Sequence, residues 1–181
     1  MEFRTSGLNL AIVDSDKSHI DDIQIIEPLS FGKHHWSSKA FISEFSSNYS
    51  VYKSAICNSK TVGYIGSWII GDEGHITTLA VHPDFRKKHI ADILLYSLFI
   101  ELKSKNIKWL TLEVRVSNIA AVNLYKKFKF KQLGIRKKYY QDNNEDGLIL
   151  WTENIQNPEN ELMLNSIISQ VIEQNNHADK L

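Results

Sequence analysis

The sequence predicts a mixed α/β domain in which a mostly antiparallel sheet is flanked by helices. Apolar residues alternate with polar ones along residues 109–116, which is typical of a strand with one buried face. Apolar residues recur at helical spacing in residues 90–103. Runs of both kinds follow one another with short polar turns between them, so we expect them to pack as layers around one core.

The first half of the chain predicts two short helices and then three strands. Ile20, Ile23 and Ile26 have helical spacing, and two helices joined by a turn are expected within residues 19–44. β-Rich runs follow, separated by turn-prone residues. The expected strands are residues 51–57, 61–70 and 75–81, and the turns between them are residues 58–60 and 71–74.

The second half predicts alternating helices and strands. The helix at residues 90–103 is closed by turn-prone Asn106. Ser117 and Asn118 suit the N-cap of a helix over residues 119–128, and Pro158 suits the first turn of a final helix. The remaining expected elements are strands at 109–116, 130–135 and 147–151, a polar loop at 141–146, and a tail helix with the apolar stripe Leu164, Ile167, Ile168, Val171 and Ile172.

The composition is that of an ordinary globular domain with no overall charge. The chain has 181 residues, 43% of them hydrophobic and 23% charged, which suits one domain with extra segments at its ends. We expect an N-terminal extension at residues 1–18, a main domain at residues 19–153, and an amphipathic helix and tail at residues 154–181. Lys and Arg together number 21, as do Asp and Glu, so no global field favours nucleic acid or an anionic membrane as a partner.

The cysteine and histidine content further narrows the kinds of protein that this chain can be. Cys57 is the only cysteine, which excludes an internal disulfide and a cysteine-rich zinc site, and we expect it to be a small buried apolar residue. His34, His35 and His82 lack metal-ligand partners at suitable spacing and are expected as surface or core histidines. No apolar run approaches the ~20 residues of a membrane span, and the first residues lack the pattern of a secretory signal. We therefore expect a cytoplasmic protein without a metal site, either a monomer or a weak dimer.

A strand, a basic turn and a helix meet in residues 79–91. Pro83 ends the apolar strand, and residues 86–89 read Arg-Lys-Lys-His before the helix begins. A helix N-terminus offers unpaired N–H groups and a partial positive charge, so such a turn is suited to phosphate. Taken alone, a turn of this kind is most often a solvated basic surface, and phosphate binding depends on what surrounds it.

Four blocks of sequence carry a resemblance. They are residues 75–83 (HITTLAVHP), residues 112–118 (LEVRVSN), Ala120-Ala121 with Leu124-Tyr125, and Tyr139-Tyr140 with Glu145-Asp146-Gly147. In this order they resemble the GNAT acyltransferases, and more narrowly the members that acetylate protein N-termini, including the RimI-type ribosomal-protein alanine N-acetyltransferases. Arg86 and Ala91 fit the acetyl-CoA-binding pattern of that family. The resemblance covers somewhat over half of the chain and implies the GNAT fold.

The resemblance also implies a reaction and its residues. It points to an acetyl-CoA-dependent N-acetyltransferase acting on a protein N-terminus, with the N-terminal alanine of ribosomal protein S18 as the suggested acceptor. Glu113 would take a proton from the amine, and Tyr125 would donate one to the leaving thiolate. A peptide α-amine has a pKa of about 7.7–8.0, so a modest base suffices. Tyr139 and Tyr140 would line the peptide site. The residues implied for acetyl-CoA are Leu79, Ala80, Val81, Arg86, Lys87, Lys88, His89, Ile90, Ala91, Asp92 and Asn118.

Each of these residues also has a structural alternative. Glu113 is on its own a solvated charge, Tyr125 a half-buried core residue, and Asn118 a helix cap. Tyr139 and Tyr140 are on their own strand aromatics. For the whole chain, the alternatives are a GNAT enzyme acting on a small amine such as a polyamine or an aminoglycoside, and a binding module whose cofactor site has decayed.

Two residues depart from the family pattern, because His89 and Lys129 stand where the family has glycine. Glycine lets a pyrophosphate approach the backbone without meeting a Cβ, so His89 predicts weakened acetyl-CoA binding. Histidine enters the left-handed region more readily than most residues, and its ring could donate to phosphate. Lys129 follows a helix where a left-handed residue would end it, which predicts a positive φ at a cost of roughly 1 kcal/mol.

Overall fold

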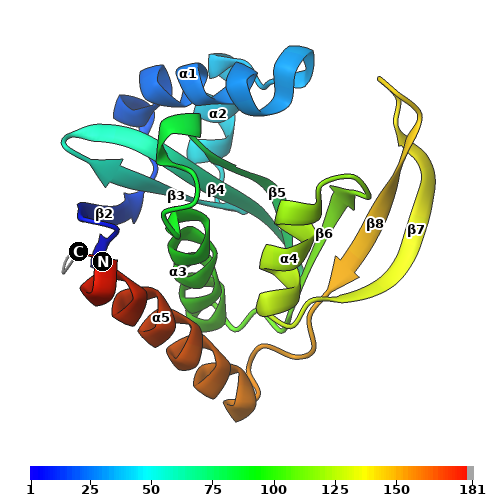
Figure 1. The fold of residues 1–181 in the computed structure, drawn as a ribbon. Coiled ribbons are helices and arrows are strands. Elements are labelled where there is room, and N and C mark those ends of the chain that lie inside the picture. Colours follow the sequence, from blue (N-terminus) through cyan, green and yellow to red (C-terminus); the bar gives the residue numbers. More distant parts are fainter. Residues whose placement is uncertain (179–181) are drawn as a thin grey trace.

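The computed structural model describes residues 1–178, with side chains as far as residue 172. This part of the chain forms one eight-stranded sheet with helices on both faces (Figure 1), which confirms the expected α/β fold. The strands are β1 (Glu2–Thr5), β2 (Leu8–Asp14), β3 (Ser50–Cys57), β4 (Lys60–Ile70), β5 (Glu73–Val81), β6 (Trp109–Arg115), β7 (Lys131–Tyr140) and β8 (Glu145–Trp151). The α-helices are α1 (Ile20–Phe31), α2 (Ser38–Phe45), α3 (Ile90–Ser104), α4 (Ile119–Lys127) and α5 (Pro158–Ala178).

The sheet is antiparallel except at one pair of neighbouring strands. Its order is β1-β2-β3-β4-β5-β6-β8-β7, and β5 and β6 are the parallel pair. These two strands pair over a short stretch, from Glu73 opposite Trp109 to His75 opposite Thr111. Beyond it they diverge, as Figure 1 shows, so that the sheet opens into a wedge at its centre.

Two hydrophobic clusters fix the layers. On one face, α1 and α2 pack on β3, β4 and β5 through a cluster that includes Ile23, Phe41 and Tyr64. On the other face, α3 packs on β3 to β5, and its buried residues join those of β6 and α4 in the main core. Figure 1 shows α4 in front of the opening between β5 and β6. The wedge therefore has a helix start, that of α3, on one side and α4 on the other.

Both ends of the described chain are built into this core. Residues 1–18, expected as an extension, contain strands β1 and β2, and Leu10 and Ile12 of β2 are buried between less buried neighbours. The tail helix α5 covers α3 and β1, and Leu164, Ile167 and Val171 of the expected apolar stripe join the main core. Ile172 of that stripe is exposed. Residues 179–181 of the expected tail lie outside the described residues.

The expected elements agree with the structure except at some of their ends. Strand β7 runs to residue 140 instead of 135. Strand β8 begins at residue 145 instead of 147, so the loop expected at residues 141–146 shortens to residues 141–144. Strand β5 begins at residue 73, inside the expected turn. Cys57 is buried as expected. Of the helices that the structure describes, none is long and apolar enough to cross a membrane.

Candidate active site

One edge of β5 faces the wedge. The N–H of His82 donates to the carbonyl of Val62 on β4 at 2.9 Å. Successive residues of a strand direct their backbone groups to opposite sides, so Leu79 and Val81 direct theirs away from β4 and toward the opening. The Val81 carbonyl there accepts the Nε of Arg86 at 3.0 Å. Strand β5 thus directs backbone groups to a place where an extended ligand could pair with them. The hydrogen bond from Arg86 to Val81 holds the end of the strand.

A β-bulge marks the place where β5 turns away from β6. The register between β4 and β5 shifts between Gly66 and Ser67, which leaves Thr77 as the extra residue on β5. The Oγ1 of Thr77 lies 3.4 Å from the hydroxyl of Tyr52. A bulge bends its strand and increases the local twist, so it contributes to the divergence that makes room for a ligand.

The turn between β5 and α3 contains two left-handed residues. Lys87 has a φ of 61° and His89 a φ of 58°. The left-handed conformation of His89 agrees with its place at a family glycine, whereas that of Lys87 was not expected. Ile90 begins α3 and is 1% exposed as a whole residue, so its side chain belongs to the main core. The first N–H groups of α3 thus follow a turn held in a glycine-like conformation.

Asp92 in the first turn of α3 contacts the side chains of Lys127 and His89. Its carboxylate accepts the Nζ of Lys127 at 2.7 Å and lies 3.3 Å from the Nδ1 of His89. Its side chain is 13% exposed. The predicted cofactor residue Asp92 therefore links the turn to the end of α4.

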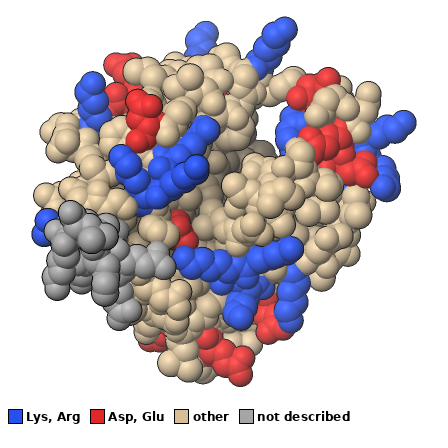
Figure 2. Space-filling model, viewed as in Figure 1, with Lys and Arg blue, Asp and Glu red and all other residues tan. Residues whose placement is uncertain are grey.

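Basic side chains gather on both sides of the wedge entrance. Figure 2 shows them over the turn before α3 and again over α4. The turn supplies Arg86, Lys87 and Lys88, and the last turn of α4 supplies Lys126 and Lys127. A chain with no net charge therefore carries a local positive potential that suits an anionic ligand.

Glu113 lies on the other side of the wedge and has a partner. Its Oε1 lies 3.1 Å from Nη2 of Arg136 on β7, and its side chain is 27% exposed. Strand β8 lies between β6 and β7, so this ion pair spans three strands. The guanidinium of Arg136 also lies 5.4 Å from the ring centroid of Tyr139. Arg136 was not foreseen from the sequence, where it is one of several basic residues in succession.

Tyr125 and Tyr140 lie within electrostatic reach of one another. Burial raises the pKa of Tyr125, and the nearby Tyr140 raises it further. Burial likewise raises the pKa of Tyr140 to about 12, against the opposing effect of Arg115, whose guanidinium lies 3.9 Å from the ring centroid. Glu113 also acts on the pKa of Tyr140. Tyr140 thus interacts electrostatically with both predicted catalytic residues, Tyr125 and Glu113.

The loop between β7 and β8 is fixed to the end of β6. Arg115 pairs with Asp142 at 2.9 Å and with Glu145 at 3.3 Å. Glu145 also accepts the N–H of Ser117 at 2.7 Å, and hydrogen bonding to Ser117 is the main reason that its pKa falls to about 2. The Nε2 of His34 lies 3.8 Å from Asp142, so the connection between α1 and α2 reaches the same loop.

Two predictions about the ends of α4 are confirmed. The side chain of Asn118 accepts the N–H of Ala121 at 3.1 Å, which makes it the N-cap of α4. Lys129 has a φ of 62° just beyond the end of that helix. A cofactor contact of Asn118 stays a prediction.

A buried carboxylate under the connection between α1 and α2 was missed from the sequence. Glu27 is 1% exposed, accepts the N–H of Trp36 at 2.6 Å and accepts the hydroxyl of Tyr64. Burial raises the pKa of Glu27 above its usual range. A signal was present, because Glu27 follows Ile20 and Ile23 at spacings that put all three on one face of a helix.

A pocket lies outside the wedge. This pocket, of about 400 Å³, is bounded by residues of β5 to β8, among them Trp109, Leu133 and Trp151. Over the described part of the chain, no group of three or more His, Cys, Asp or Glu side chains is arranged to hold a metal ion. The lining of that pocket contains none of the predicted site residues.

Comparison with known proteins agrees with this geometry. A model of the acetyltransferase (GNAT) family matches residues 20–130. A protein of Bacillus subtilis strain 168, provisionally named a ribosomal protein bS18-alanine N-acetyltransferase, is 41% identical over 133 residues, which cover 73% of this chain and 87% of the relative. The ribosomal protein bS18-alanine N-acetyltransferase of Escherichia coli K12 is 33% identical over 117 residues, 64% of this chain and 78% of the relative.

Solved structures show the same likeness. The crystal structure of the ribosomal-protein-S18-alanine N-acetyltransferase from Escherichia coli matches with a TM-score of 0.73 and 28% identity, over 80% of this chain and 94% of that one. The PaiA N-acetyltransferase of Thermoplasma acidophilum, solved in complex with coenzyme A, shares the fold at a TM-score of 0.66 and 17% identity, over 80% of this chain and 98% of that one. The chain therefore belongs to the acetyltransferase (GNAT) family and is an N-acetyltransferase.

Proposed function

We propose that this chain transfers the acetyl group of acetyl-CoA to the α-amine of a protein N-terminus, and that the N-terminal alanine of ribosomal protein S18 is its acceptor. The observation that carries acetyl transfer is the divergence of β5 from β6, with backbone groups on one side and Glu113 on the other. The acceptor is supported by two relatives named for bS18 acetylation, at 41% and 33% identity.

The acetyl donor fits the β5 side of the wedge. The backbone groups of Leu79 and Val81 would pair with the extended pantetheine arm, as in the addition of a strand to a sheet. The pyrophosphate would lie at the start of α3, where the helix N–H groups and the basic side chains of Lys87 and Lys88 favour an anion. A backbone N–H of this diverging strand near Val81, one that is not paired with the pantetheine arm, would stabilise the negative charge that develops on the thioester oxygen.

Glu113 of β6 and Tyr125 of α4 would carry out the proton transfers. The neutral amine attacks the thioester carbon, its nitrogen forms the new C–N bond, and its proton passes to the carboxylate of Glu113 directly or through a water. The C–S bond breaks, and the phenol of Tyr125 supplies the proton that the departing thiolate takes up. Because burial raises the pKa of Tyr125, this phenol stays protonated at neutral pH.

The test compares two kinds of acceptor. The purified chain is incubated with acetyl-CoA and either a peptide beginning Ala-Arg-Tyr or spermidine, and CoA release is measured beside mass spectrometry of the products. We expect acetylation of the peptide α-amine and none of the same peptide with a blocked N-terminus. Turnover of spermidine without turnover of the peptide would replace the proposal with a small-amine enzyme, and no turnover of either would reject both acceptors.

Glu113→Gln tests the role of the base. The rate should fall most at low pH, where the amine is mostly protonated and needs a base to accept its proton. The matched control is Glu153→Gln, which changes an exposed carboxylate paired with Lys131 and should keep the wild-type rate. A loss that is the same at every pH would assign Glu113 to positioning instead.

A further inference from the structure

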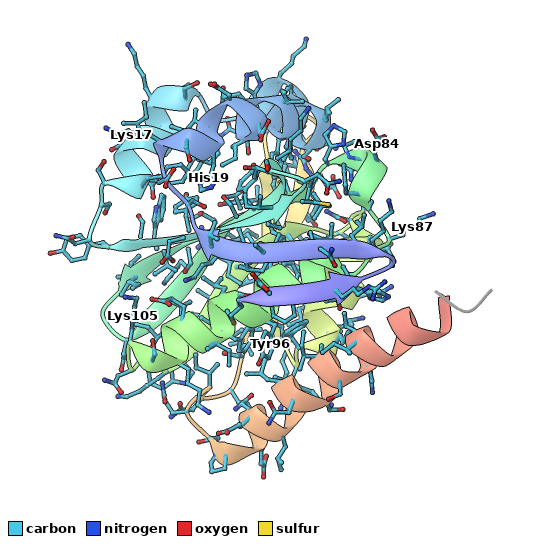
Figure 3. The ribbon with its side chains drawn as sticks, turned by 90° about the vertical axis from the view of Figure 1, so that its left-hand side faces the viewer. Lys17, His19, Asp84, Lys87, Tyr96 and Lys105 are labelled. Atoms are coloured by element: carbon cyan, nitrogen blue, oxygen red, sulfur yellow. The ribbon has the colours of Figure 1, made fainter. Side chains whose placement is uncertain are left out.

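Thr5 connects the N-terminal hairpin to the turn before α3. It ends β1 and is 0% exposed. Its Oγ1 donates to the carbonyl of Lys88 at 2.8 Å, across 83 positions of sequence. Figure 3 shows the hairpin of β1 and β2 reaching the turn that carries Lys87. A hydroxyl of the first strand therefore contacts the backbone of the turn that forms the candidate phosphate site.

This contact is made to the residue that lies between the two left-handed residues of the turn. Lys88 stands between Lys87 and His89, whose φ values are 61° and 58°. Residues with a Cβ occupy this region at a cost, and glycine would occupy it freely. Because Lys87 and His89 hold this conformation at a cost, an external bond to the carbonyl between them helps to keep the turn in it.

The bond also sets the direction of an N–H group. The peptide after Lys88 is trans, as are all those that the structure describes. In a trans peptide the carbonyl of one residue and the N–H of the next point in opposite directions. Because the Lys88 carbonyl points at Thr5, the N–H of His89 points away from the hairpin. That N–H stands at the start of α3, where an anion would bind.

We propose that Thr5 is a positioning residue for the anionic part of the acetyl donor, and that the hairpin of β1 and β2 replaces the conformational control that glycines give elsewhere in this family. This inference rests on the proposed use of acetyl-CoA. It explains how a turn with Lys87 and His89 at left-handed positions can keep a phosphate-binding shape. It also assigns a role to residues 1–18, which lie outside the matched family region of residues 20–130.

The first test measures binding without any acceptor. Thr5→Val removes the hydroxyl and keeps the shape, whereas Thr5→Ser keeps the hydroxyl. The dissociation constant of CoA, measured by calorimetry, should rise roughly three- to tenfold in Thr5→Val, as for the loss of one hydrogen bond, and stay near wild type in Thr5→Ser. Pantetheine, which lacks the pyrophosphate, should bind all variants alike. The control Thr152→Val removes another buried hydroxyl, which accepts the N–H of Leu110 at 2.9 Å, and should bind CoA normally.

The second test uses glycine to remove the need for Thr5. In a Lys87→Gly, His89→Gly background, adding Thr5→Val should change CoA affinity by less than about twofold, since the turn is then unstrained. The proposal is overturned if Thr5→Val binds CoA like wild type, if CoA and pantetheine weaken equally, or if the loss is undiminished in the glycine background. Failure of the acceptor assay with intact CoA binding would reject the proposed peptide substrate and leave this inference standing.

Discussion

Replacement of Tyr125 by phenylalanine removes one hydroxyl and keeps the packing around it. The ring lies 5.4 Å from that of Phe130 in an edge-to-face contact, and the residue is 6% exposed. Loss of a general acid typically slows a reaction by about 10²- to 10⁴-fold. At about 1.36 kcal/mol for each factor of ten, this equals roughly 2.7–5.4 kcal/mol of transition-state stabilisation. We expect that fall in kcat, with CoA affinity unchanged.

The assay is CoA release at saturating acetyl-CoA and peptide, over a range of pH. Because burial raises the pKa of Tyr125, the wild-type rate should show no alkaline decline from this group at any pH below its ordinary value of 10. The matched control is Tyr96→Phe on α3, whose ring packs on Phe3 at 6.2 Å and which should keep the wild-type rate. A fall of less than about tenfold in Tyr125→Phe, or an equal fall in the control, would refute the role of an acid.

Three further predictions concern affinity and stability. His89→Gly should bind CoA about fivefold more tightly by calorimetry, equivalent to about 1 kcal/mol, and equal or weaker binding would mean that the imidazole contributes. Burial raises the pKa of Glu27, so stability from its protonated form is fully present below the ordinary value of 4.5 and is lost as pH rises through the raised one. The excess unfolding free energy of wild type over Glu27→Gln, from urea titrations, should therefore shrink between pH 4 and pH 7, and a constant difference would contradict this. Gly66→Ala would place a Cβ 2.2 Å from the ring of Tyr52 and should cost about 1–3 kcal/mol in thermal unfolding, whereas Gly134→Ala, with its nearest contact at 3.4 Å, should be nearly neutral.

Periodicity predicted the elements whose two faces differ. Strand β6 buries Leu110, Leu112 and Val114 beside partly exposed Glu113 and Arg115, helix α3 buries Ile90, Leu94, Leu98 and Leu102, and both were found close to their expected bounds. Strand β7 was predicted too short because it is an edge strand. Most of its residues are exposed, and its pairing with β8 is irregular between Arg136 and Tyr140. An exposed strand shows no alternation in its sequence, so pattern alone cannot give its end.

The residues of the site likewise divide into those that the sequence predicted and those that it did not. Local spacing predicted the turn before α3 and the cap at Asn118, because each depends on residues close in sequence. Arg136 and Thr5 were not predicted, since each reaches its partner through the order of strands or across a large sequence separation. Which side chains face one another across a sheet depends on the order and register of its strands, and the spacing of residues within one segment does not give that order.

The short parallel pairing of β5 with β6 makes the base of the wedge a pivot between two halves of the sheet. Side chains already fill the space around that pivot. A Cβ on Gly74 would lie 2.6 Å from Leu110 and 2.8 Å from Leu102, so β5, β6 and α3 are already in closest contact there. Close-packed interiors resist deformation. The angle between the halves is thus set by side-chain volume at the pivot. An added methyl group there, far from the reacting atoms, would change the separation of β5 from β6 and would therefore act on both substrates at once.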